Sequence, residues 1–295
     1  MSDRESETHE FRYEISRLPL YKGARLFIGG KIMKKIIGSV CVLFIIGLVT
    51  FIEPSVVFAA DEYDVYAKIE SFTWKEFDGG SQLLKESGPI YGIGLSVKGD
   101  IFKSLTLKTR GELFMGSVDY DGQTQAGTPV ETDTDYKGLK IEVDGGWKII
   151  EKEESSFEPF VGLGVRRWTR DIQSTGSAIG YEETWKSLYA RLGIRGDHTN
   201  PNKLIVFAEA AVKLPIYNEN EIDGSAFGVG DVTVEPGNKA SFFAEAGFKW
   251  KKFKSSIFYE GMRLSKSDIV IVSGVSLYQP ESKADIFGVN LGMSF

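Results

Sequence analysis

The sequence contains very little cysteine and histidine. Its single cysteine, Cys41, lies inside an apolar run, so the exported part of the chain would have no disulfide. His198 is the only histidine beyond residue 60. Acidic residues outnumber basic ones by 41 to 35, and an acidic chain without a basic stripe is not expected to bind nucleic acid. Beyond residue 52 there is no continuous apolar run of 20 residues, which argues against a transmembrane helix there.

The N-terminal part of the chain has the three regions of a secretory signal peptide. Residues 33–35 (Met-Lys-Lys) are positively charged, residues 36–52 are apolar, and a small-residue site follows. We expect a signal peptide over 33–59 with cleavage after Ala59. Residues 1–32 have mixed charge and no clear period, and we interpret them as a disordered extension that arises from a start-site error. An inner-membrane anchor is the alternative, but the pattern that follows favours export.

From Tyr63 to Phe295, apolar and polar residues alternate with a period of two. That period is typical of a β-strand with two different faces. A wall with one apolar face and one polar face suits lipid outside and packed polar groups or water inside. The last stretch shows the alternation clearly, with apolar Phe287, Val289, Leu291, Met293 and Phe295 between polar or small Gly288, Asn290, Gly292 and Ser294.

This pattern predicts an all-β fold over 60–295, a closed, antiparallel, up-and-down transmembrane β-barrel. Short connections alternate with long ones, as in outer-membrane barrels, where short turns face the periplasm and long loops face outward. With both ends of the barrel in the periplasm, the strand number is even. We expect ten strands, with eight as the alternative. The expected strands are 62–77, 88–99, 103–118, 136–150, 157–170, 184–197, 203–216, 239–250, 253–266 and 284–295, with long connections at 78–87, 119–135, 171–183, 217–238 and 267–283.

Alternation also assigns the faces of the strands. Apolar residues such as Leu139, Ile141 and Phe242 are expected to face lipid. Aromatic residues are expected at both membrane interfaces, because their rings are apolar and their N–H or O–H groups prefer water. We assign Tyr63, Trp147, Trp250, Phe253 and Phe295 to the periplasmic interface and Trp74, Trp168, Trp185 and Tyr217 to the outer one.

The opposite face carries many charged residues. Each Arg or Lys placed in lipid would cost about 2–4 kcal/mol, so these side chains must face the lumen. They can form a packed, charge-paired interior, or they can line a narrow aqueous pore whose surplus of bases favours anions. The lumen charges are Lys108, Arg110, Glu112, Lys140, Glu142, Asp144, Arg166, Arg170, Arg191, Arg195, Glu209, Lys213, Glu245 and Lys249.

No catalytic residue, metal site or cofactor is expected. Omptin-type proteases need an Asp-His pair at the outer rim, whereas His198 lies in a polar turn expected on the periplasmic side. The connections 119–135 and 217–238 are acidic and contain no base, but their spacing does not match a calcium-binding loop. These acidic loops are the expected surface for an extracellular ligand.

Two segments resemble parts of known barrels. Residues 157–165 (FEPFVGLGV) resemble the P-[YF]-V-G-L-G strand of small outer-membrane barrels of the OmpA/opacity-like type. Residues 288–295 resemble the C-terminal strand signal read by the barrel assembly machinery, which ends in an aromatic residue, here Phe295. The resemblance implies a Gram-negative outer membrane, contact with its lipid and lipopolysaccharide, and no catalytic activity. We expect a structural or surface-recognition barrel with a lumen filled by paired charges. The alternative is a narrow porin-like channel for small, anionic solutes.

Peptide mass spectrometry of the protein from the membranes of expressing cells should give a mature N-terminus at residue 60, because export removes the signal peptide. A peptide from 1–32 in the mature protein would contradict the start-site interpretation.

Overall fold

The computed structural model describes residues 59–295 except 125–126, 177, 226–227, 229 and 273–274. Residues 1–58, and with them almost all of the expected signal peptide, lie outside the described residues. Within the described residues, no helix has the length and apolar character needed to cross a membrane.

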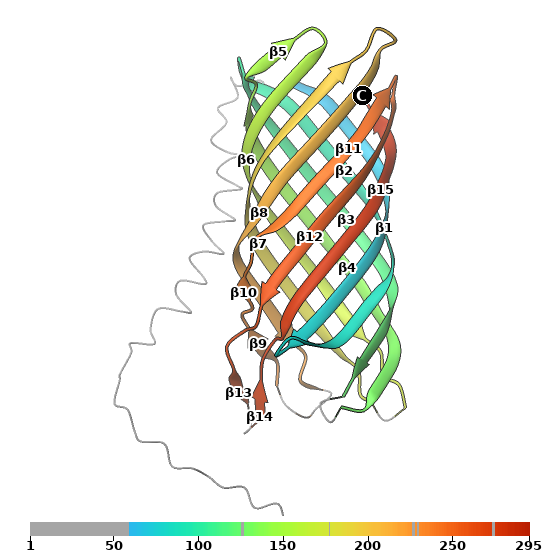
Figure 1. Ribbon diagram of the computed structural model, residues 1–295, viewed down its shortest axis with the longest axis vertical. Helices are drawn as coiled ribbons and strands as arrows, with labels where there is room; N and C mark the ends of the chain where they lie inside the picture. The colour runs from blue at the N-terminus through green and yellow to red at the C-terminus, as the bar shows by residue number, and fades with distance from the viewer. Residues whose placement is uncertain (1–58, 125–126, 177, 226–227, 229, 273–274) are drawn as a thin grey trace, which may run out of the picture. The chain divides into compact units, whose positions relative to one another are not determined.

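Ten long antiparallel strands form a closed barrel (Figure 1). Each strand pairs with its neighbours in chain order, and β1 pairs with β15 to close the ring. The prediction of ten strands is confirmed, and the alternative of eight is wrong. The strands are β1 (Ala59–Asp78), β2 (Ser81–Phe102), β3 (Leu105–Gln123), β4 (Pro129–Trp147), β6 (Ser155–Ile172), β7 (Tyr181–Thr199), β8 (Leu204–Ile222), β11 (Ser241–Trp250), β12 (Phe253–Ser265) and β15 (Glu281–Ser294).

Short strands extend the connections at both ends of the barrel. We call the end with Phe295 and the turns 103–104 and 251–252 the turn end, and the opposite end the loop end (Figure 1). The short strands are β5 (Ile150–Lys152) at the turn end, and β9 (Val232–Val234), β10 (Gly237–Asn238), β13 (Val270–Val272) and β14 (Val275–Leu277) in the loop-end connections.

The first expected long connection, 78–87, is wrong. β1 and β2 remain paired to Asp78 and Ser81, so only Gly79 and Gly80 connect them. Both glycines have positive φ, 56° and 88°, as a two-residue type I′ hairpin turn requires. The Gly-Gly pair marked this turn in the sequence. The expected loop 119–135 is also mostly strand, because β3 and β4 stay paired to Gln123 and Pro129.

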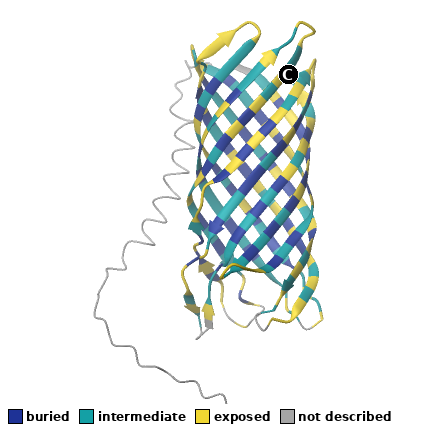
Figure 2. Ribbon diagram, in the orientation of Figure 1, coloured by how far each residue is buried: buried dark blue, intermediate teal, exposed yellow. Residues whose placement is uncertain are grey.

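Burial alternates along each strand, as Figure 2 shows in the banding of the ribbon. Ile141 is 45% exposed, whereas its neighbour Glu142 is 1% exposed and faces the lumen. Phe242 is exposed and Phe243 is buried in the same way. The expected outward faces of β4, β8 and β11 are therefore confirmed.

The expected outer aromatic interface is wrong at three of its four positions. Trp74, Trp168 and Trp185 are buried in the lumen, where Trp168 stacks on Trp185 with ring centroids 5.4 Å apart. The reason is parity. Trp168 lies on the same face of its strand as Arg166 and Arg170, so it points inward with them. At the turn end, the expected interface residues Tyr63, Trp147, Trp250, Phe253 and Phe295 are all exposed.

The two ends of the barrel sequence meet at the turn end. The Tyr63 amide donates to the Phe295 carbonyl at 3.1 Å, and the Phe295 amide donates back to the Tyr63 carbonyl at 2.9 Å. At the loop end, Lys266 Nζ donates to Asp78 at 2.8 Å, which ties the β12–β15 connection to the β1–β2 turn. This hydrogen bond raises the pKa of Lys266.

Gly138→Ala should destabilise the barrel by about 1–3 kcal/mol, because the lumen has no space for an added methyl group. Its Cβ would lie 2.5 Å from the Phe114 ring and 2.6 Å from the Arg167 carbonyl oxygen. Gly111→Ala on neighbouring β3 is the matched control, since nothing lies within 4 Å of its Cβ. Urea unfolding in detergent micelles measures both. Equal stability of the two variants would contradict the close packing at Gly138.

Candidate functional site

All fourteen expected lumen charges lie on the inner face of the barrel. Twelve are buried residues, and the other two, Lys108 and Lys249, keep only 14% and 12% of their side chains exposed near the turn end. They come from β3, β4, β6, β7, β8 and β11, so the barrel wall brings them together from six strands.

Arg191 forms the centre of the largest network. Its Nη1 lies 2.7 Å from Asp144 and 3.1 Å from Glu142, and its Nη2 lies 2.8 Å from Glu209. All four side chains are at most 3% exposed. A buried charge is tolerated only when opposite charges and hydrogen bonds replace its hydration shell. The Arg191 guanidinium on β7 and the three carboxylates on β4 and β8 replace one another's hydration, and their contacts link the three strands.

Two ion pairs cross the full diameter of the lumen. Arg110 on β3 bonds Glu245 on β11 at 2.9 Å, and Lys140 on β4 bonds Glu260 on β12 at 2.8 Å. In the ring order, β3 lies five strands from β11, and β4 lies five strands from β12, so each pair joins opposite walls. Side chains from opposite walls are therefore in direct contact across the lumen at both pairs.

A third crossing lies nearer the loop end. Trp74 on β1 meets Trp185 on β7, again five strands away, with ring centroids 5.3 Å apart. Beside the rings, Arg170 donates from Nε and Nη2 to Glu86 at 2.9 and 2.7 Å. The same guanidinium pairs with Glu76 at 3.2 Å and with Glu183 at 2.9 Å. Aromatic rings and charges therefore fill this level together.

The expected surplus of lumen bases is wrong. The fourteen predicted residues include nine bases and five acids, but the buried residues in the described part of the chain, taken together with Lys108 and Lys249, include eleven bases and twelve acids. The missed charges share one parity with their lumen neighbours, as in β1, where Asp64, Lys68, Glu70 and Glu76 alternate with outward residues. This alternation in the sequence could have identified the missed charges as lumen residues. The missed buried charges are Asp64, Lys68, Glu70, Glu76, Glu86, Glu158, Glu183, Lys254 and Glu260.

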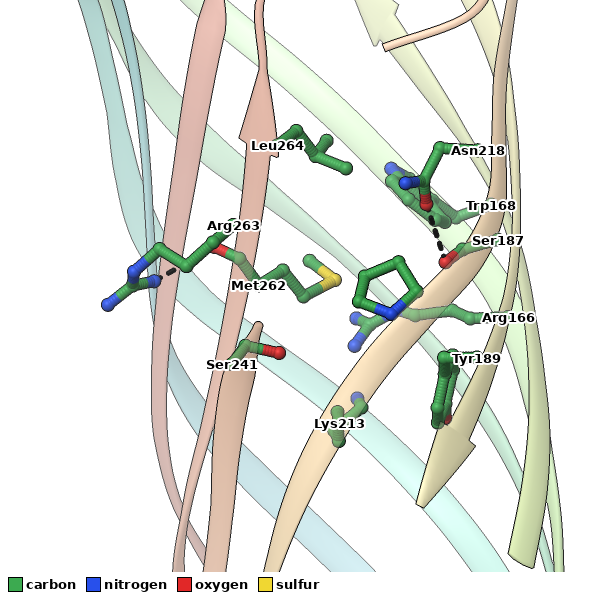
Figure 3. Close-up of a pocket in the computed structure, with 11 residues that line it drawn as sticks. Arg166, Trp168, Ser187, Tyr189, Lys213, Asn218, Ser241, Met262, Arg263 and Leu264 are labelled. Carbon is green, nitrogen blue, oxygen red and sulfur yellow. Dashed lines mark hydrogen bonds between the residues drawn. The ribbon is translucent and has the colours of Figure 1, made fainter. Parts of the chain in front are cut away.

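The cavities described within the barrel are small. One, of about 20 Å³, is lined by Arg166, Tyr189, Lys213 and Met262 among others (Figure 3). Another, beside Arg110 and Asn290, measures about 10 Å³. Each has room for about one water molecule. A larger cavity of about 130 Å³ lies at the turn end, where Lys98, Lys249 and Lys254 are among the residues that line it.

His198 lies at the turn end and is not part of the lumen network. It is exposed, and its Nδ1 lies 2.9 Å from the Ser155 hydroxyl oxygen. Among the described residues, no group of three or more His, Cys, Asp or Glu side chains is arranged to hold a metal ion.

The loop end carries exposed carboxylates on the outer face of the β3–β4 hairpin. Asp119 is directly opposite Asp133, and Asp121 is opposite Glu131. The expected acidic residues of 119–135 therefore project from paired strands and not from a long loop.

Most of the barrel sequence matches one protein family. The model of the autotransporter β-domain matches residues 73–256, more than half of the 295-residue chain. The chain belongs to the autotransporter β-domain family. No curated protein matches this autotransporter β-domain.

Three solved structures are similar to this autotransporter β-domain. The outer-membrane protease OmpT from Escherichia coli has a TM-score of 0.55 and 12% identity over 82% of this chain and 99% of its own. The β-domain of the Bordetella autotransporter BrkA has a TM-score of 0.39 and 13% identity over 80% of this chain and 100% of its own. The attachment invasion locus protein Ail of Yersinia pestis has a TM-score of 0.35 and 12% identity over 79% of this chain and 98% of its own. At such identities OmpT shows a shared fold alone.

Family and fold make this chain an outer-membrane β-barrel of Gram-negative bacteria. Barrels of this type lie among outer-membrane lipids and are assembled by the barrel assembly machinery. In such barrels the short turns face the periplasm, which orients the turn end of this autotransporter β-domain inward and the loop end toward the exterior.

Arg191→Met should lower the free energy of unfolding by about 3–5 kcal/mol, because three buried carboxylates lose their shared cation. Arg167→Met is the matched control, since Arg167 is exposed on the outer face of β6 and forms no ion pair within the described residues. It should not lower the free energy of unfolding, because Arg167 is opposite outward-facing Leu139, where an apolar side chain is tolerated at least as well. Urea titration in micelles measures both.

Adding Glu142→Gln and Asp144→Asn should recover part of the loss in Arg191→Met, because fewer carboxylates are then left unpaired. No recovery in the triple variant would contradict the electrostatic role of Arg191.

Proposed function

We propose that this autotransporter β-domain is a non-catalytic outer-membrane barrel with an occluded lumen and a structural or surface-recognition role. The observation that carries the proposal is the pair of diametric contacts, Arg110–Glu245 and Lys140–Glu260, at 2.9 and 2.8 Å. Where side chains from opposite walls are in contact, they block the lumen at that height along the barrel axis. A barrel of about eight strands is just filled by its side chains, and ten strands lie close to that limit.

A narrow channel for small solutes is the second candidate. The cavity of about 130 Å³ at the turn end favours it, because water and small solutes can enter there from the periplasm. Lys98, Lys249 and Lys254 line that cavity, but each of them pairs with a carboxylate. Lys98 pairs with Glu158 at 2.9 Å, Lys254 with Asp64 at 2.5 Å, and Lys249 with Glu62. Such pairing reduces the attraction for anions, and the crossings above the cavity oppose conduction.

The loop end supplies the surface for a recognition role. Carboxylates placed directly opposite one another, as Asp119 and Asp133 are, destabilise a hairpin. Their exposure on outward strand extensions suits contact with cationic groups outside the cell. Enzymatic activity has less support, because the protease OmpT shares only the fold at 12% identity, and His198 lies at the turn end.

Single-channel recording in a planar bilayer tests the occluded lumen. The purified protein should give no discrete conductance steps. The double variant Arg110→Ala/Glu245→Ala, which removes one diametric contact and both of its charges, should give steps. The matched control is Lys186→Ala/Glu219→Ala, which removes an ion pair of 2.7 Å on the outer face of β7 and β8.

Heat-modifiable gel mobility must first show that all three proteins are folded. Discrete anion-selective steps in the unmodified protein would favour the channel and contradict the proposal. Steps in the Lys186/Glu219 control would show that altered stability, and not an opened lumen, produces current.

A further inference from the structure

A row of four cations crosses the outer face of four neighbouring strands near the loop end. Lys75 on β1 faces outward, because its neighbours Trp74 and Glu76 are buried in the lumen. It is directly opposite Lys85 on β2 and Lys283 on β15. Lys283 in turn is opposite Arg263 on β12. We call Lys85, Lys75, Lys283 and Arg263 the basic row.

The carboxylates near the basic row do not neutralise its centre. Asp285 pairs with Arg263 at 2.5 Å, and Glu281 is shared between Lys283 at 3.2 Å and Lys239 at 2.8 Å. Asp121 is the register partner of Lys85 on the β3 side.

Lys75 and Lys85 form no hydrogen bond or ion pair with any residue that the structure describes. Side chains directly opposite one another have Cβ atoms about 4.5–5.5 Å apart, and like charges in that position are destabilising. Lys75, which has a lysine on each side, therefore has no ion pair of its own; the carboxylate that it attracts, Asp285, is paired with Arg263.

The basic row lies just beyond the apolar part of the same face. Ile69, Tyr91 and Phe287 are 54%, 53% and 59% exposed on β1, β2 and β15. Tyr259 on β12 packs against Phe287 with ring centroids 4.9 Å apart.

On β12, Arg263 lies four residues closer to the loop end than Tyr259, and on β15, Lys283 lies four residues closer to it than Phe287. Four residues correspond to about 10 Å along the axis of a barrel with tilted strands. Aromatic side chains mark the interface between lipid tails and head groups. The basic row is therefore at the height of the head groups of the outer leaflet.

The flank of the barrel next to the basic row has the reverse charge, beginning at β3, the neighbour of β2. Near the loop end, β3, β4 and β6 present Asp119, Asp133, Asp135 and Asp171 on their outer face, and Asp135 is directly opposite Asp171. These carboxylates repel an anionic head group. They bound the basic row on one flank. On the far side of the barrel Arg167 is opposite Lys186, but Lys186 is paired with Glu219 and Glu221 at 2.7 and 3.3 Å.

We propose that the face of β12, β15, β1 and β2 is a binding site for the phosphorylated head group of an outer-leaflet lipid, lipopolysaccharide. Lys75 and Lys283 hold the phosphate, and long lysine side chains can bend toward it while their stems stay on the apolar surface. The acyl chains lie on Ile69, Tyr91, Tyr259 and Phe287. This site is independent of whether the lumen conducts.

The test is the apparent Kd of lipopolysaccharide for the full-length protein extracted from outer membranes into a non-ionic detergent, measured by thermophoresis. Lys75→Gln/Lys283→Gln should weaken binding about thirtyfold, because each lysine near a charged lipid surface contributes about a factor of five. Lys75→Arg/Lys283→Arg keeps the charge and should bind within about threefold of the unmodified protein. Lys251→Gln/Lys252→Gln, the same charge change in a turn-end turn, is the matched control and should leave the Kd unchanged.

Two further probes identify the ligand. Lipopolysaccharide stripped of its phosphates should bind the unmodified protein as weakly as intact lipopolysaccharide binds Lys75→Gln/Lys283→Gln. Inorganic phosphate at millimolar concentration should not compete, because it lacks the acyl chains. Equal binding of intact and stripped lipid, an equal loss in the Lys251/Lys252 control, or competition by inorganic phosphate would each overturn the proposal. Heat-modifiable mobility confirms that every variant is folded before its Kd is compared.

Discussion

Backbone pairing between β1 and β15 is the interaction on which the rest of the structure depends. A membrane offers no water to the N–H and C=O groups of a sheet edge, so a sheet can cross it only as a closed ring. Pairing runs without interruption from Asp64 and Ser294 to Phe77 and Glu281, which leaves neither strand with an open edge there. It also brings Tyr63 against Phe295, so the two ends of the barrel sequence become neighbours.

Closure with ten strands fixes the width of the interior, and that width decides what the lumen can be. Side chains from opposite walls are close enough to touch, so charges that avoid lipid on one side meet counter-charges from the other. Each is expensive to bury alone, and a missing partner would leave an unpaired charge in a dry interior. Pairing across the diameter satisfies the charges, and in the occluded barrel that we propose the same contacts close the lumen. Ion pairing and the proposed occlusion thus have one physical cause.

The outer surface of this autotransporter β-domain follows a different rule, because it faces lipid and then head groups. There like charges need not be paired by protein, since a lipid or a solute can supply the counter-ion. Opposed cations at Lys75 and opposed carboxylates at Asp119 both persist at the loop end, on adjoining parts of the outer face. The seven strands from β1 to β8 other than β5 have 18–22 residues, well beyond the 9–11 that a bilayer requires, and this extension exposes charged surface at the loop end.

Local sequence decided the strands and their faces, because a period of two is a property of each strand alone. It determined ten strands, an apolar outside and a charged inside, and it contained two signals that our interpretation missed, the Gly79–Gly80 turn and the inward parity of Trp74, Trp168 and Trp185. Which charges meet could not be read in this way. Arg110 and Glu245 are 135 residues apart, and Lys75 and Lys283 belong to opposite ends of the barrel sequence. Those contacts depend on the register of every strand around the closed ring, and a register is set only when all the neighbours pair.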